Sequence, residues 1–234
     1  MSFQTTRWSV VAAAGGGDLS AARAAIATLC ETYWYPLYAY IRRRGANPDE
    51  ARDLTQGFLL SLLERQDFEQ LRPDRGRFRA FLLASLKHFL LNDAARQRTL
   101  KRGGGAVFLP LTLDDAEGRY RFEPADLTTP ETLYERRWAF TVVDRALTSL
   151  RQEWDATGRV EEFDALKPCL LGEAPGGYQA VAVQLGTTEG AVKVAVHRLR
   201  RKFQGQLRRE VAETVADPSE VVEEIRYLIR ALKT

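Results

Sequence analysis

Apolar residues recur at helical spacing along most of this 234-residue chain. Residues 21–44 are rich in Ala, Leu and aromatic residues. Asn47 is suited to cap a second helix, in which Leu54, Phe58 and Leu62 follow one another at four-residue intervals. The same periodicity predicts further helices over 78–98, 130–151, 160–171, 178–185 and 188–203. With no strand signal of any length after residue 171, the sequence predicts an all-α fold.

The helical pattern stops between residues 103 and 130, where a run of three glycines is followed by Pro110, Pro124 and Pro130. A stretch of this length exceeds an ordinary loop within a domain, so we interpret it as an acidic linker. The sequence therefore predicts two small helical domains joined by a long linker. The expected boundaries are 1–102 for the first domain, 103–130 for the linker, 131–209 for the second domain and 210–234 for a helical extension.

The formal net charge of +3 conceals two strongly basic segments. Residues 72–102 contain nine basic and two acidic side chains, and residues 193–209 contain seven basic and no acidic ones. Acidic segments follow both, with seven acids in 103–135 and six in 210–225. Two separate basic segments indicate two contacts with a polyanion such as nucleic acid. Two ordinary solvated helix faces are the alternative explanation.

Composition narrows the function classes. Two cysteines and two histidines exclude a disulfide scaffold and make a metal site unexpected, and they fit a reducing, cytoplasmic location. No apolar run approaches the roughly 18 residues of a membrane span, and the first residues lack a signal-peptide pattern. The glycine run at 103–105 is not followed by the Lys-Ser/Thr pair of a phosphate loop. With no catalytic constellation in view, we expect a protein that is not an enzyme and uses no cofactor or metal.

The most specific pattern covers residues 178–203. Gly186 can adopt the positive φ of a tight turn between two helices, and Thr188 is suited to cap the second one. Val192, Val196 and Leu199 form an apolar stripe on that helix, opposite a basic face. This arrangement predicts a helix-turn-helix whose second helix enters the major groove of DNA. The predicted contact residues are Thr187, Thr188, Glu189, Gly190, Lys193, Val194, His197, Arg198, Arg200 and Arg201.

The segments 178–182, 185–186, 189–193 and 197–198 resemble the promoter-reading domain of bacterial sigma factors. The closest class is the extracytoplasmic-function (ECF) sigma factors, which have two helical domains and a linker. Ala191 stands where that family prefers Thr, and Val194 and Ala195 replace a polar pair. These departures leave fewer side-chain donors for reading bases, so the promoter sequence does not carry over from the family.

The resemblance extends to the N-terminal half. Residues 53–58 resemble the helix with which the family binds the clamp helices of RNA polymerase. It implies a polymerase-binding surface made of Asp53, Leu54, Gln56 and Leu60. Residues 75–82 and the helix they begin resemble the segment that melts the promoter. The implied DNA-binding residues there are Arg75, Arg77, Arg79, Lys87, His88, Asn92 and Arg96.

The resemblance implies a sigma factor that takes core RNA polymerase to promoter DNA, binding both duplex and melted single strand, with no membrane partner. Whether an anti-sigma factor or the 210–234 extension regulates it stays open. We expect that extension, part of which is spaced as an amphipathic helix, to pack on the second domain. Two other functions explain parts of the pattern. One is a helix-turn-helix regulator that acts without polymerase, and the other is a helical signalling adaptor.

Overall fold

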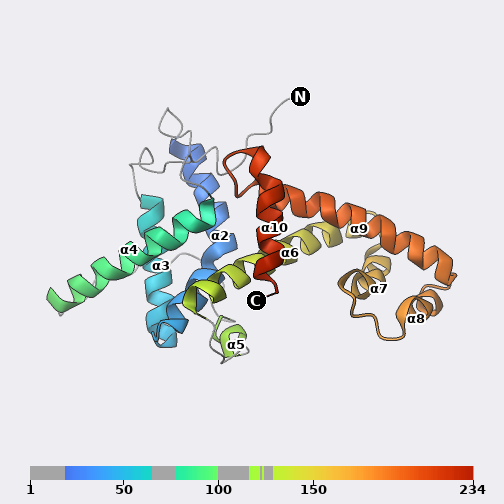
Figure 1. The fold of residues 1–234 in the computed structure, drawn as a ribbon, viewed down its shortest axis with the longest axis horizontal. Helices are drawn as coiled ribbons and strands as arrows, with labels where there is room; N and C mark the ends of the chain where they lie inside the picture. The colour runs from blue at the N-terminus through green and yellow to red at the C-terminus, as the bar shows by residue number, and fades with distance from the viewer. Residues whose placement is uncertain (1–18, 65–76, 100–115, 122, 124–128, 234) are drawn as a thin grey trace. The chain divides into compact units, whose positions relative to one another are not determined.

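The computed structural model describes residues 19–64, 77–99, 116–121, 123 and 129–233, and within these ranges every regular element is a helix (Figure 1). The prediction of an all-α fold is therefore confirmed for the part of the chain described. The chain divides into two compact units. Unit 1 consists of residues 1–141 and 211–234, and unit 2 consists of residues 142–210. Helix α6 (Pro130–Asp155) and helix α9 (Glu189–Ala212) each contribute residues to both.

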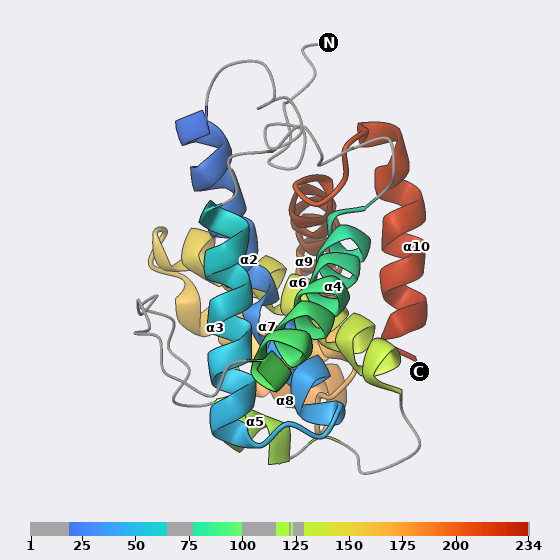
Figure 2. The ribbon, with the colours of Figure 1, turned by 90° about the vertical axis from the view of Figure 1, so that its left-hand side faces the viewer.

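Unit 1 is built on α2 (Leu19–Arg43) and α3 (Pro48–Glu64), which run side by side (Figure 2). The turn between them uses Gly45 at a φ of 102°, and the Asn47 side chain accepts a hydrogen bond from the Glu50 amide at 2.9 Å. The asparagine cap expected from the sequence therefore forms. Phe58 and Leu62 of α3 are buried, as their spacing predicted.

Helix α4 (Phe78–Thr99) completes the aromatic core of unit 1. The rings of Tyr33 and Phe78 meet edge to face with centroids 5.1 Å apart, and both side chains are fully buried. Trp138, from the part of α6 that belongs to unit 1, is also fully buried. Aromatic side chains contribute large apolar areas, which is how a unit of few helices can bury a continuous core.

Helix α5 (Ala116–Arg121) is the helical part of the predicted linker that the structure describes. Its Glu117 accepts hydrogen bonds from both Nε and Nη2 of Arg42 in α2, each at 3.0 Å, and from the Tyr38 hydroxyl at 2.7 Å. The Arg42 guanidinium also lies over the Tyr120 ring, 4.8 Å from its centroid. This part of the linker region is thus a packed element of unit 1. Residues 100–115 lie outside the described part of the chain.

Unit 2 combines the C-terminal part of α6 with α7 (Val160–Leu171), α8 (Gly177–Gln184) and most of α9. Its core is formed by Leu150 and Trp154 of α6, Phe163 and Leu166 of α7, and residues of α8 and α9. Cys169 is buried in the same cluster, consistent with its role as a small apolar residue.

The C-terminal extension differs from its expected placement. After α9 the chain forms a short 3₁₀ turn, η4 (Pro218–Glu220), and helix α10 (Val221–Ala231). Residues 211–234 belong to unit 1, so the expectation that this extension packs on the second domain was wrong. A hydrogen bond from the Phe78 amide to the Thr214 carbonyl at 3.2 Å fastens it to the start of α4.

Candidate nucleic-acid interface

The turn between α8 and α9 has the local chemistry expected from the sequence. Gly186 adopts a φ of 61°, in the left-handed region that glycine enters without strain. The Thr187 amide donates to the Ala182 carbonyl at 2.9 Å, and the Gly186 amide donates to Val183 at 3.2 Å. The last carbonyls of α8 are therefore satisfied within the turn.

Helix α9 begins with a side-chain cap. The hydroxyl oxygen of Thr188 accepts a hydrogen bond from the Ala191 amide at 3.2 Å, and the Val192 amide donates to the Thr188 carbonyl at 3.1 Å. Val192 and Val196 are each 1% exposed and Leu199 is fully buried. These three side chains point into the unit 2 core, which fixes the opposite face of α9 toward solvent.

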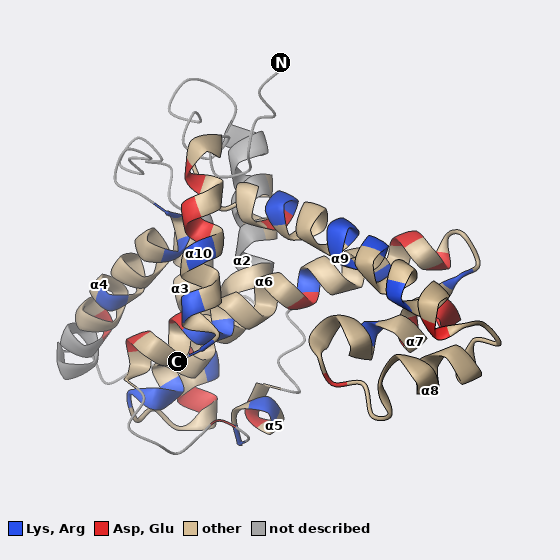
Figure 3. Ribbon diagram, turned by 45° about the vertical axis from the view of Figure 1, so that its right-hand side comes forward, with Lys and Arg blue, Asp and Glu red and all other residues tan. Residues whose placement is uncertain are grey.

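Lys and Arg residues recur along α9 (Figure 3), and those from Lys193 to Arg209 are all exposed. All the residues predicted at this interface are exposed, namely Thr187, Thr188, Glu189, Gly190, Lys193, Val194, His197, Arg198, Arg200 and Arg201. Lys193 is bound to Glu189 at 2.6 Å, and this hydrogen bond raises the pKa of Lys193. Arg200 turns toward the neighbouring helices, where it donates to the Cys169 carbonyl at 3.4 Å. Arg198 and Arg201 therefore have the freer positions on this face.

The predicted melting segment on α4 divides into exposed and buried members. His88 and Asn92 are exposed, and Lys87 is half-buried. Arg75 lies outside the described residues, and the structure describes the backbone of Arg96 but not its side chain. The exposed polar surface that α4 offers to a ligand is thus centred on His88 and Asn92.

Arg77 and Arg79 make contacts that the sequence analysis did not foresee. The Nε of Arg79 donates to Glu224 at 2.7 Å, and the Nη1 donates to Glu135 at 3.1 Å. The Nε of Arg77 lies 2.6 Å from the other carboxylate oxygen of Glu224. Glu224 is completely buried and Arg79 is 6% exposed, so this is an internal ion cluster.

Aromatic rings enclose the Arg79 guanidinium. Its central carbon lies 3.7 Å from the centroid of the Tyr227 ring and 5.1 Å from that of Trp138. Tyr227 also donates a hydrogen bond to Glu135, whose pKa is raised by burial. Arg79 is therefore unavailable for the DNA contact predicted for it, because its charge and donors are used inside unit 1. Glu224 lies on the same face of α10 as Val221, Ile225 and Leu228. An acid within an apolar stripe indicates a buried carboxylate, so the sequence did contain a signal for the partner of Arg79.

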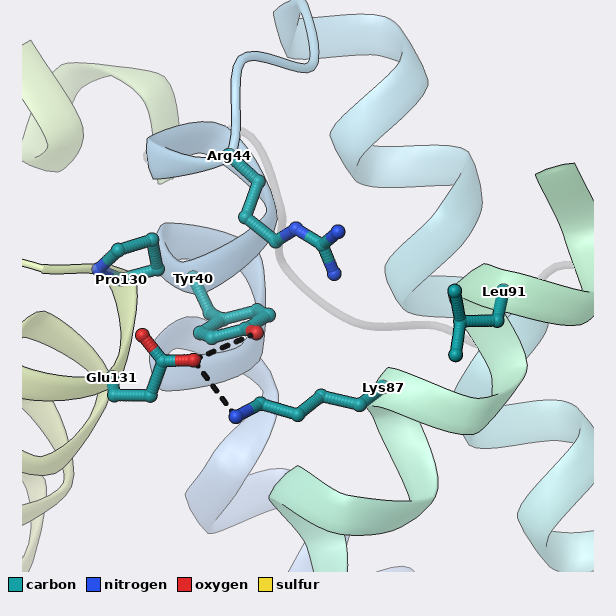
Figure 4. Close-up of a pocket in the computed structure, with 6 residues that line it drawn as sticks. All are labelled: Tyr40, Arg44, Lys87, Leu91, Pro130 and Glu131. Atoms are coloured by element: carbon teal, nitrogen blue, oxygen red, sulfur yellow. Dashed lines mark hydrogen bonds and ion pairs between the residues drawn. The ribbon is translucent and has the colours of Figure 1, made fainter.

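Lys87 lines a shallow pocket formed by α2, α4 and the start of α6 (Figure 4). Its Nζ is 2.8 Å from the Glu131 carboxylate, to which the Tyr40 hydroxyl donates at 3.3 Å. These contacts raise the pKa of Lys87 and lower that of Glu131. Arg44 lies over the Tyr40 ring at 5.9 Å, and Leu91 is 64% exposed at the pocket rim.

The residues predicted to bind polymerase do not all share one surface. Asp53 is exposed, and Leu54 and Leu60 are half-buried, but Gln56 is only 7% exposed. Gln56 therefore points into unit 1 and offers little surface to a partner. Asp53 and Leu54 line a second shallow pocket together with Gly57 and with Phe89 and Asp93 of α4.

Comparison of the chain with models of known protein families, with curated proteins and with solved structures gave no match. Within the described ranges no helix has both the length and the apolar character needed to cross a membrane. Those same ranges contain no group of three or more His, Cys, Asp or Glu side chains that could hold a metal ion. The geometry of the two basic regions is therefore the main indication of function.

Proposed function

We propose that this protein is a transcription initiation factor of the sigma class, which binds core RNA polymerase and directs it to promoter DNA. The observation that carries this proposal is the α8–turn–α9 geometry. A capped helix follows a tight glycine turn, and buried Val192, Val196 and Leu199 leave its basic face exposed. We infer a helix-turn-helix from these features, a motif whose second helix lies in the major groove of DNA.

In this proposal α9 reads duplex DNA with the residues near its N-terminus and holds phosphates with Arg198 and Arg201. Phosphate contacts fix the position of a protein on DNA, and base-edge contacts supply the sequence preference. On α4, His88 and Asn92 offer exposed polar groups to the melted strand. The burial of Arg79 removes one of the cations expected there, so the melting function rests on fewer residues than the sequence suggested.

One specific observation favours a second candidate, a helix-turn-helix regulator that binds DNA without polymerase. Arg79 and Gln56 are buried, so the two surfaces proposed for unit 1 are smaller than the sequence analysis expected. A pull-down of core polymerase with the full chain separates the two candidates. The sigma proposal expects binding, and expects Asp53→Ala to weaken it while Glu173→Ala in unit 2 does not. Absence of binding would contradict the sigma proposal and leave the regulator and the signalling adaptor.

DNA binding itself is tested by salt titration with the wild type and Arg198→Ala. Affinity is expected to fall steeply with salt, and Arg198→Ala should reduce the slope of log K against log salt by about 1. Arg151→Ala is the matched control, since it removes an exposed arginine of unit 2 that lies on α6 and is bound to Asp164 of α7 at 2.8 Å. A flat salt response would contradict DNA binding and favour a signalling adaptor.

A further inference from the structure

One valine on the basic face of α9 points outward. Val192 and Val196 are each 1% exposed, whereas Val194 between them is 51% exposed. Single exposed apolar residues are common on protein surfaces and need no explanation by themselves. Val194 differs because it follows Lys193 directly and precedes His197 by one helical turn, on the face that carries the arginines.

Gly190 lies one turn before Val194 and on the same face of the helix, because residues four apart are neighbours on a helix surface. A Cβ atom added at Gly190 would meet only the Thr188 hydroxyl oxygen, at 4.0 Å. The φ of Gly190 is not positive, so neither packing nor backbone geometry requires glycine here. Glycine within a helix costs about 0.5–1 kcal/mol relative to alanine. The gap it leaves is therefore open to a ligand at the surface.

Two charged residues beside this gap, Lys193 and Glu189, are already paired. Lys193 and Glu189 bind each other at 2.6 Å, so using either in a base contact means giving up that ion pair. The gap beside Val194 needs no such exchange, because it is formed by an apolar side chain and a missing one. The surface available without rearrangement is thus apolar, with cationic side chains around it that match a phosphate backbone.

We propose that Gly190 and Val194 form a notch that accepts the 5-methyl group of thymine in the major groove. Thymine presents that methyl group in the groove, where apolar side chains distinguish it from the other bases. Gly190 supplies the clearance and Val194 supplies the apolar contact. This inference rests on the proposed function, since it requires α9 to lie in the groove.

The test uses the full chain with core polymerase and a duplex selected from a randomised DNA library. Each thymine of the selected duplex is replaced in turn by deoxyuridine, which removes only the methyl group. One or two positions should lose about fourfold in affinity, the value expected for one methyl group taken out of contact. Elsewhere in the duplex the replacement should have no effect.

Variants then assign the effect to the notch. Val194→Ser removes both methyl groups of the side chain, and it should bind the thymine and deoxyuridine duplexes equally. Gly190→Ala fills the gap and should weaken binding at the same position while the protein stays folded by circular dichroism. Val183→Ser is the matched control, because Val183 is 80% exposed on α8, and it should retain the discrimination.

The outcomes separate the notch from the proposed function. A selected duplex with no deoxyuridine-sensitive position overturns the notch and leaves DNA recognition by α9 standing. A sensitive position that persists in both Val194→Ser and Gly190→Ala also overturns it, because the methyl group is then read elsewhere. If no duplex is selected at all, both the notch and the proposed function fail.

Discussion

The side chain of Glu224 has no exposed surface, yet it carries the negative charge that faces Arg77 and Arg79. Burying charges is expensive, and a buried pair contributes little net stability compared with apolar residues. Removing one partner is a different matter, because the other charge then remains buried and uncompensated. Glu224 is therefore a residue of unit 1 at which a small change should have a large effect.

Glu224→Gln preserves the shape of the side chain and removes its charge. We expect it to lower the free energy of unfolding by about 3 kcal/mol, the lower end of the range for breaking a buried ion pair, since Arg79 keeps Glu135 as a second partner. Glu223→Gln is the matched control, because Glu223 binds Arg77 at 3.2 Å with 68% of its side chain exposed. It should cost no more than about 1 kcal/mol. Urea unfolding followed by tryptophan fluorescence measures both, and equal effects would show that the cluster does not depend on the buried charge.

Alanine substitutions at two glycines of unit 2 distinguish the cost of backbone strain from the effect of helix propensity. Gly186 has a φ of 61° and open space around its Cα, so Gly186→Ala adds no clash and tests the backbone alone. It should destabilise by about 1–2 kcal/mol, the cost of the left-handed conformation for other residues. Gly190→Ala should be neutral or stabilising by up to about 1 kcal/mol. Thermal unfolding of the two variants side by side checks this, and the reverse order would contradict the turn geometry.

At the scale of helices, periodicity predicted most elements because apolar burial decides where a helix faces. The stripe of Val192, Val196 and Leu199 was visible in the sequence and is buried in the structure. Turn chemistry at Gly186 and capping at Thr188 and Asn47 were also predictable, since each depends on residues within one turn. Helix α5 was not predicted, because the glycine and proline content of this region indicated a linker. The helix is anchored by the ion pair between Glu117 and Arg42, and Arg42 is far away in the sequence.

Acid should destabilise helix α5, because it protonates Glu117. Its pKa is lowered, chiefly by the hydrogen bond from Arg42. A carboxyl whose pKa is lower in the folded state stabilises that state above its unfolded pKa, and the stabilisation disappears as the pH falls through the folded value. The protection factors of the α5 amides, which compare the exchange rate with its intrinsic value at the same pH, should therefore fall below about pH 4. Glu117→Gln should have low protection factors at every pH, and a wild type that stays protected in acid would show that Glu117 does not anchor the helix.

At the scale of the whole molecule, the sequence predicted the all-α class but not which segments belong to one unit. Local patterns place α10 as an amphipathic helix after Asp217, which caps its turn by accepting from the Ser219 amide at 2.8 Å. They do not say what its apolar face covers. That depends on Arg79, Trp138 and Glu135, which lie far away in sequence and meet Tyr227 and Glu224 only in the folded chain. Arg79, which stands in a basic segment typical of nucleic-acid binding, was therefore assigned to DNA although its partners lie inside unit 1.

The Arg79–Glu224 contact also has a consequence for folding during synthesis, because its two residues are 145 positions apart. A ribosome adding about 5–20 residues per second makes Arg79 about 7–29 seconds before Glu224. In that interval the Arg79 guanidinium lacks Glu224, and the ring of Trp138 lacks Tyr227. The core of unit 1 can therefore be completed only after α10 has been synthesised, although most of its helices are made much earlier.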